Sequence, residues 1–108
     1  MSKTNKTKTE ALKISTTTYN KVIERDNYAC VLCRLVGIHP RLKESNVLSC
    51  HHYINRSHLG MGIEQNLVML CYHHHQEETR YREVIKGYLM SMYDNWNEED
   101  LIFRKGGK

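Results

Sequence analysis

Hydrophobic positions first recur with a helical period shortly after a run of threonines. Tyr19, Val22 and Ile23 fall at helical spacing, and Thr16–Thr18 offer side chains that cap a helix N-terminus. Asp26 and Asn27 then interrupt the pattern. The sequence therefore predicts a short first helix that ends just before a pair of cysteines.

The longest helical stripe lies near the C-terminus. Six apolar or aromatic residues fall at i, i+3, i+4, i+7, i+8 and i+11, which predicts a helix with one face on a core: Tyr81, Val84, Ile85, Tyr88, Leu89 and Met92. Gly87 weakens such a helix by about 1 kcal/mol relative to alanine. We expect a break near Gly87 or between Gln76 and Tyr81.

Between these helices the pattern changes to that of strands. Residues 47–54 and 67–70 favour two strands, and residues 57–62, which contain two glycines, favour a turn between them. The order is helix, cysteine-rich knuckle, two strands and helix, which predicts a small α+β domain. Trp96 and residues 101–103 are expected to fold back as a cover.

The domain boundaries follow from the same pattern. Residues 1–13 lack an apolar period and carry interspersed lysines, so we expect a flexible basic tail. The domain then occupies residues 14–108, with a core at 28–76 and a helical cover at 77–108. A chain of 108 residues has room for one such domain, whose modest core would benefit from a bound metal.

Composition places limits on compartment and partners. The chain has no apolar run long enough for a membrane span, and its start lacks the apolar region of a signal peptide. We expect a cytoplasmic protein, in which four cysteines more often bind metal than form disulfides. A formal net charge of +4 is compatible with a phosphate-rich partner.

Two ligand pairs predict a structural zinc site. Cys30 and Cys33 have two residues between them, and so do Cys71 and His74, a spacing that lets both members of a pair reach one tetrahedral ion. The alternative is a set of buried free thiols, which would leave the polar histidine unexplained.

The fourth ligand is less sharply defined, because three histidines are consecutive. His74 lies seven residues before Tyr81 and would share its buried stripe on a continuous helix, whereas His75 would be turned about 100° toward another site. His73 is expected to be exposed. Cys50 is a further thiol in plausible reach, although a small buried apolar role is commoner for such a residue. Replacement of His74 by His73 or Cys50 therefore stays open.

Three segments resemble the HNH (His-Asn-His) endonuclease family: Cys50-His51-His52-Tyr53-Ile54-Asn55-Arg56-Ser57, Asn66-Leu67-Val68 and Cys71-Tyr72-His73-His74-His75. The resemblance covers about residues 28–75. It rests on a histidine pair on the first strand, an asparagine opening the second, and a histidine directly after a zinc pair. It implies a ββα-metal (His-Me finger) core.

The resemblance also implies roles for individual residues. His52 would be the general base, His51 and His75 would bind a catalytic divalent ion, and Asn66 would hold the loop and the base in place. An imidazole titrates near neutral pH, and a metal neutralises charge on the phosphate and the leaving oxygen. The products would be a 5′-phosphate and a 3′-hydroxyl.

The histidine pair raises two points, its geometry on a strand and its metal preference. Strict alternation along a strand would point His51 and His52 to opposite faces, so we expect them at a frayed or strongly twisted strand end. Many family members carry aspartate where this chain has His51. An imidazole ligand should shift the metal preference from Mg²⁺ toward Mn²⁺, Co²⁺, Ni²⁺ or Zn²⁺.

Each residue alone has an ordinary structural explanation. A single strand histidine is often satisfied by the backbone, and a single asparagine is often a turn residue. His58 lies in the glycine-containing turn and is more often a solvated loop residue than a ligand. Arg56 could clamp a phosphate or be an ordinary surface charge.

Positive charge is spread along the chain without a dense patch. The lysines and arginines that could contact DNA are Lys3, Lys6, Lys8, Arg34, Arg41, Lys43, Arg56, Arg80, Arg82, Lys86, Arg104, Lys105 and Lys108. This distribution favours salt-sensitive phosphate contact with low sequence specificity.

The function predicted is DNA cleavage, by nicking or by double-strand cutting. The alternative is a zinc-knuckle nucleic-acid or protein adaptor that does not cut; a zinc hydrolase of another kind is disfavoured because no HExxH motif is present. Small members of the family often stand beside phage DNA-packaging genes, so terminase proteins are candidate partners. The sequence leaves the oligomeric state open.

Overall fold

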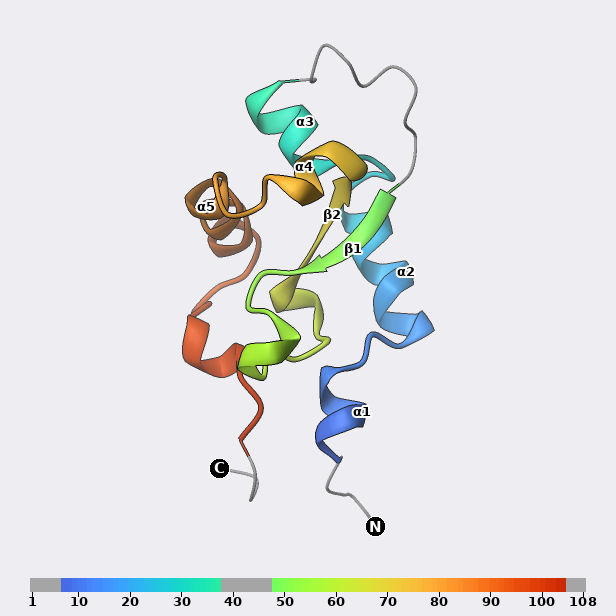
Figure 1. Cartoon of the computed structure of the whole chain (residues 1–108), viewed down its shortest axis with the longest axis vertical. Coiled ribbons are helices and arrows are strands. Elements are labelled where there is room, and N and C mark those ends of the chain that lie inside the picture. Colours follow the sequence, from blue (N-terminus) through green and yellow to red (C-terminus); the bar gives the residue numbers. More distant parts are fainter. Residues whose placement is uncertain (1–6, 38–47, 105–108) are drawn as a thin grey trace.

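The computed structural model describes residues 7–37 and 48–104 as an α+β domain (Figure 1). Its sheet consists of β1 (Leu48–His52) and β2 (Leu67–Cys71), which pair antiparallel. The predicted hairpin is thus confirmed. Some predicted features lie outside the described residues, namely the start of the first strand at Val47 and the charges Lys3, Lys6, Arg41, Lys43, Lys105 and Lys108.

Strand β2 is buried along its whole length because apolar clusters cover both of its faces. Val68 and Leu70 join a cluster with α3 (Val31–Val36) and α5 (Arg82–Met92). Leu67 and Met69 join a second cluster with Val22 of α2 (Thr16–Arg25). Successive residues of β2 thus face the two clusters in turn, which is why the strand is apolar at every position.

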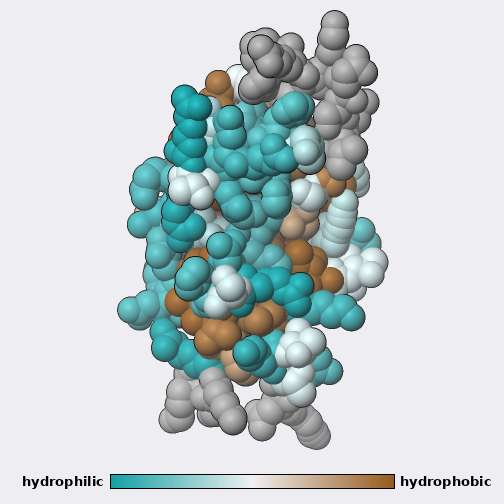
Figure 2. Space-filling model, in the orientation of Figure 1, coloured by the Kyte–Doolittle hydropathy of each residue, from teal (hydrophilic) through white to brown (hydrophobic). Residues whose placement is uncertain are grey.

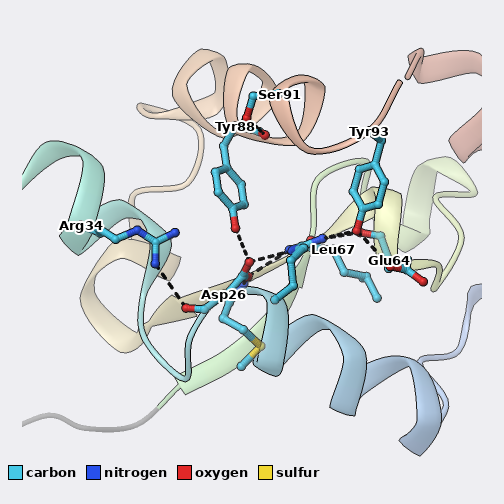
Figure 3. Close-up of polar contacts among 9 residues, drawn as sticks. Asp26, Arg34, Glu64, Leu67, Tyr88, Ser91 and Tyr93 are labelled. Carbon is cyan, nitrogen blue, oxygen red and sulfur yellow. Dashed lines mark hydrogen bonds and ion pairs between the residues drawn. The ribbon is translucent and has the colours of Figure 1, made fainter. Parts of the chain in front are cut away.

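Helix α2 agrees with the first predicted helix, although its cap lies one residue earlier. The Ser15 hydroxyl accepts a hydrogen bond from the Thr18 backbone N–H at 3.1 Å. At the other end, the fully buried Asp26 accepts hydrogen bonds from the Met69 backbone N–H at 2.9 Å and from the Tyr88 hydroxyl (Figure 3). Asp26 therefore ties α2 to β2 and α5.

Arg25 reinforces this junction. Its guanidinium pairs with Asp26 at 2.7 Å and donates to the carbonyls of Glu64 at 2.8 Å and Leu67 at 2.6 Å. A buried carboxylate is tolerated when it is paired and hydrogen-bonded in this way. The local sequence around Asp26 predicts only a helix stop, and its buried role appears only in the tertiary contacts.

The expected tail of residues 1–13 is wrong at residues 8–12, which form α1 (Lys8–Leu12). The side chains of Thr7 and Glu10 each accept a hydrogen bond from the backbone of the other, and Ala11 and Leu12 are buried. Five residues are too few to show a helical period. The capping box Thr7-x-x-Glu10 was the available signal.

The C-terminal half contains two helices, α4 (Tyr72–Gln76) and α5, separated at residues 77–81. The break therefore lies between Gln76 and Tyr81 and not at Gly87. Ile85 and Leu89 are buried, as the stripe predicted, whereas Met92 is 41% exposed. None of the described helices is long and apolar enough to cross a membrane.

The segment after α5 covers the hairpin loop, as expected. Leu101, the last residue of η4 (Glu98–Leu101), is buried, and its carbonyl accepts from the Met61 backbone N–H at 2.8 Å. The Trp96 indole N–H donates to the Gln65 carbonyl at 2.8 Å. The face in Figure 2 is largely hydrophilic, with hydrophobic residues gathered in its lower half.

Two glycines give a matched stability prediction. A Cβ on Gly60 would overlap the backbone carbonyl of Ile54, whereas a Cβ on the helical Gly87 would meet open space. Gly60→Ala is expected to lower the free energy of unfolding by about 2–3 kcal/mol. Gly87→Ala should raise it by up to about 1 kcal/mol, because alanine loses less backbone entropy in a helix. Urea unfolding of both variants measures the difference, and equal midpoints would contradict it.

Candidate metal centre and adjacent histidine cluster

Four potential ligands come together from α3, the end of β2 and α4. The ligand atoms of Cys30, Cys33, Cys71 and His74 all lie within 4.8 Å of one another. The His74 Nδ1 lies 3.4 Å from the sulfur of Cys30 and 3.5 Å from those of Cys33 and Cys71. In the part of the chain that the structure describes, this is the one group of three or more such ligand atoms gathered so closely.

These distances fit one tetrahedral ion. With Zn–S near 2.3 Å and Zn–N near 2.05 Å, a tetrahedron places two sulfurs about 3.8 Å apart and a sulfur and a nitrogen about 3.6 Å apart. The Cys33 and Cys71 sulfurs are 3.8 Å apart, and the three sulfur–nitrogen distances are 3.4, 3.5 and 3.5 Å. The donor set and the spacing both match a structural zinc site.

The ligand pairs are held by the first turns of two short helices. Cys30 occupies the N-cap position of α3, and its sulfur accepts from the Cys33 backbone N–H at 3.4 Å. Cys71 occupies the same position in α4, with His74 three residues later. Residues at the N-cap and three positions on face the same side of a helical turn, so each pair points two ligands at one ion.

His74 is thus the histidine in the Cys₃His group, as its spacing from Cys71 predicted, but the additional argument from a continuous helix was wrong. The helix is not continuous from His74 to Tyr81, although their rings do touch edge to face with centroids 5.7 Å apart. His73 lies beside Tyr72 and is outside the group. Cys50 packs instead against the second apolar cluster.

The thiols indicate why a cation belongs here. Burial, followed by the neighbouring Cys30 sulfur, raises the pKa of Cys33 to about 12. Burial also raises the pKa of Cys30. Without a cation these thiols stay protonated at neutral pH. A bound zinc ion displaces the protons and stabilises the thiolates.

A second cluster lies next to this centre. The rings of His51 on β1 and His75 on α4 meet edge to face, with centroids 5.1 Å apart. The His51 Nε2 also contacts the Glu78 carboxylate. Burial, and then the nearby His75, lowers the pKa of His51 to about 4, so the ring is neutral at neutral pH. A neutral imidazole is the form that binds metal.

Glu78 was missed by the sequence analysis. It lies three residues after His75, just as His74 lies three residues after Cys71. That repeated spacing was the only available signal, and acidic residues on exposed turns are too common for it to stand out. Contact with the buried His51 is what distinguishes Glu78 from its neighbour Glu77.

His52 takes a different partner from His51. Its Nε2 lies 3.0 Å from the Leu12 carbonyl at the end of α1, and the residue is only 9% exposed. Burial lowers the pKa of His52, the hydrogen bond to Leu12 opposes this shift, and the charge of Arg56 adds to it. The base candidate is therefore covered by an N-terminal helix that the sequence analysis did not expect.

His51 and His52 are the last two residues of β1, so they lie at a strand end as expected, but this end is not frayed. His51 pairs with Val68 and His52 with Leu67, so the β ladder runs through both histidines. Val68 and Leu67 belong to the two apolar clusters on opposite sides of the hairpin. The two imidazoles accordingly leave the strand toward different neighbours.

Asn66 joins both ends of the hairpin loop. Its side-chain oxygen accepts from the Ile54 backbone N–H at 2.8 Å, and its side-chain nitrogen donates to the carbonyls of Ile54 at 3.2 Å and Met61 at 2.8 Å. Asn66 is fully buried. These bonds fix the loop that follows the His51-His52 pair.

The loop and α5 place several cations near this region. Arg56 and His58 belong to the exposed η2 (Arg56–His58). The Arg82 guanidinium lies 4.1 Å above the Tyr53 ring and donates to the Tyr53 carbonyl at 2.8 Å. Lys86 pairs with Glu98 at 3.3 Å.

Comparison with known proteins gave no match to a family model, to a curated protein or to a solved structure.

Proposed function

We propose that the protein is a metal-dependent DNA endonuclease of the HNH type, with a ββα-metal core next to a structural zinc site. The observation that carries this proposal is the meeting of His51 and His75 edge to face beside the Cys₃His group. The resemblance of the sequence assigns a catalytic divalent ion to these two histidines. The two histidines come from different elements, β1 and α4, and the fold brings them together.

In this proposal, His52 deprotonates the attacking water. Donation of its Nε2–H to the Leu12 carbonyl fixes the tautomer and leaves Nδ1 unprotonated, which is the state a general base requires. Asn66 holds the loop after His52 through its three hydrogen bonds. Arg56, which is exposed and whose charge acts on His52, would bind a phosphate next to the base.

A divalent ion, when bound, would neutralise charge on the phosphate and on the leaving oxygen. His51 and His75 would hold it with neutral imidazoles. The products would be a 5′-phosphate and a 3′-hydroxyl. DNA would be bound through scattered cations with low sequence specificity, and phage packaging is one setting for such an activity.

A non-cutting zinc adaptor is the second candidate, and one observation favours it. His52 is covered by α1 and points away from His51, so the base and the metal-binding histidines do not converge in this conformation. An adaptor needs the Cys₃His group alone. Cleavage would require the Leu12 segment to admit a phosphate beside His52.

Supercoiled plasmid separates the two candidates. The zinc-loaded protein is expected to nick or linearise plasmid with Mn²⁺, Co²⁺, Ni²⁺ or Zn²⁺, and less well with Mg²⁺, because imidazole ligands favour the softer ions. His52→Ala should slow cleavage by about 10²–10⁴-fold, the usual contribution of a general base. His58→Ala, a change in the exposed turn, is the matched control and should cut at the wild-type rate.

Zinc content and circular dichroism of each variant must be checked, because EDTA used to stop the reaction also strips structural zinc. Plasmid binding without cutting in every metal would favour the adaptor. Full activity with Mg²⁺ and none with Mn²⁺ or Ni²⁺ would refute the expected metal preference.

A further inference from the structure

The geometry points to Glu78 as a third protein ligand of the divalent ion assigned to His51 and His75, so that this chain has a two-histidine, one-carboxylate site. This inference rests on the metal site of the proposed function, but it concerns binding and not cleavage. It assigns a role to a residue that no sequence motif singled out.

The first support is the contact between His51 and Glu78. The His51 side chain is 7% exposed and the Glu78 side chain 31%, so both are largely withdrawn from water. Among the ion pairs of the described residues, His51 is the partner of Glu78, whereas the neighbouring Glu77 pairs with Arg80 at 4.0 Å. An imidazole nitrogen and a carboxylate oxygen that lie together with little access to water are two donors that one divalent cation can bind.

The second support is the placement of the two rings. Two imidazoles that bind one ion through a nitrogen at about 2.1 Å have ring centroids about 4.5–5.3 Å apart for ligand angles between octahedral and tetrahedral. The His51 and His75 centroids are 5.1 Å apart. His51 and Glu78 are in contact, but the ligand atoms of all three residues do not lie within 4.8 Å of one another. Binding of one ion by all three would therefore require the half-buried His75 side chain to turn toward Glu78.

The third support is the way α4 and the turn after it distribute ligands. Cys71 and His74 lie three residues apart and serve the Cys₃His group. His75 and Glu78 repeat this spacing one position later, and the Glu77 backbone N–H donates to the His74 carbonyl at 3.1 Å, which continues the helical turn. One turn thus presents two ligands to each of two neighbouring ions.

This ligand set also refines the metal preference. A carboxylate adds one hard oxygen to two imidazole nitrogens, a combination that suits Mn²⁺, Co²⁺, Ni²⁺ and Zn²⁺ better than Mg²⁺, which prefers oxygen ligands throughout. Many members of the HNH family carry an aspartate at the position of His51. Glu78 would supply an acidic ligand in its place.

The test uses the full chain with its structural zinc retained, and it measures binding of Mn²⁺ by electron paramagnetic resonance and of Co²⁺ by calorimetry and visible absorption. Glu78→Gln should weaken binding of both ions by more than about 100-fold, beyond the loss usual for a residue that only orients a ligand. Glu77→Gln, the adjacent change of the same chemistry, should bind like wild type. Glu78→His should recover Co²⁺ binding but not Mn²⁺ binding, since it replaces oxygen by nitrogen.

Equal metal affinity for Glu78→Gln and Glu77→Gln would overturn the inference, as would an unchanged Co²⁺ spectrum in Glu78→His. Neither result depends on DNA cleavage. If the ion binds through Glu78 but plasmid stays intact, the nuclease proposal fails alone. If plasmid is cut and Glu78→Gln binds metal normally, the inference fails alone.

Discussion

Removal of zinc with a strong chelator is expected to unfold the protein. The four ligands join α3, the end of β2 and α4, and Cys30 and Cys71 also belong to the main apolar cluster. Structural zinc sites of this kind contribute about 10–16 kcal/mol of apparent binding free energy at pH 7. This is as large as the whole stability of a typical small domain, about 5–15 kcal/mol.

The measurement is the far-ultraviolet circular dichroism and thermal melt of the protein before and after chelation, with zinc quantified by mass spectrometry. Cys33→Ser should abolish zinc binding and the cooperative melt. Cys50→Ser is the matched control, because Cys50 lies outside the ligand group and should leave the zinc content unchanged. A zinc-free protein that melts at the original temperature would show that the four residues do not form a structural site.

Asn66→Asp is expected to produce the second largest loss of stability. The amide nitrogen of Asn66 donates to two carbonyl oxygens, of Ile54 and Met61. A carboxylate would replace this donor by an acceptor facing those oxygens, and it would place a charge at a position that is fully buried. Two unsatisfied carbonyls and a buried charge should together cost about 3–5 kcal/mol.

Urea unfolding of the zinc-loaded variant measures this loss. Asn55→Asp provides the control, because Asn55 is exposed and its side chain makes no capping hydrogen bond, so its stability should change by less than about 0.5 kcal/mol. Comparable unfolding midpoints for the two variants would mean that the Asn66 bonds do not hold the loop. A loss of plasmid cleavage by Asn66→Asp would then need another cause.

Features with a local period or spacing were predictable. The stripe around Ile85 and Leu89, the hairpin and the first helix follow from side chains that alternate every two or about 3.6 residues. The Cys₃His group follows from two pairs whose members lie three positions apart, because a single helical turn converts that spacing into proximity. The observed ends of these elements differ from the predicted ends by only a few residues.

Features that depend on contact between distant segments were not predictable from the sequence. The sequence does not show that Leu12 covers His52, because α1 is too short to have a period and its cap is its only signal. Strand alternation did predict opposite faces for His51 and His52, and the regular pairing of both residues agrees with it. The expectation of a frayed or strongly twisted end came from the shared site that the family resemblance implies.

The sequence by itself determined the α+β order of elements and the ligands of the structural metal centre, since both depend on spacing along the chain. Only the tertiary structure decided that Glu78 reaches His51 and that Asp26 is buried between α2, β2 and α5. These contacts join residues that are far apart in the sequence and that share no helical or strand repeat. Their existence depends on how apolar faces pack, and no local pattern encodes that packing.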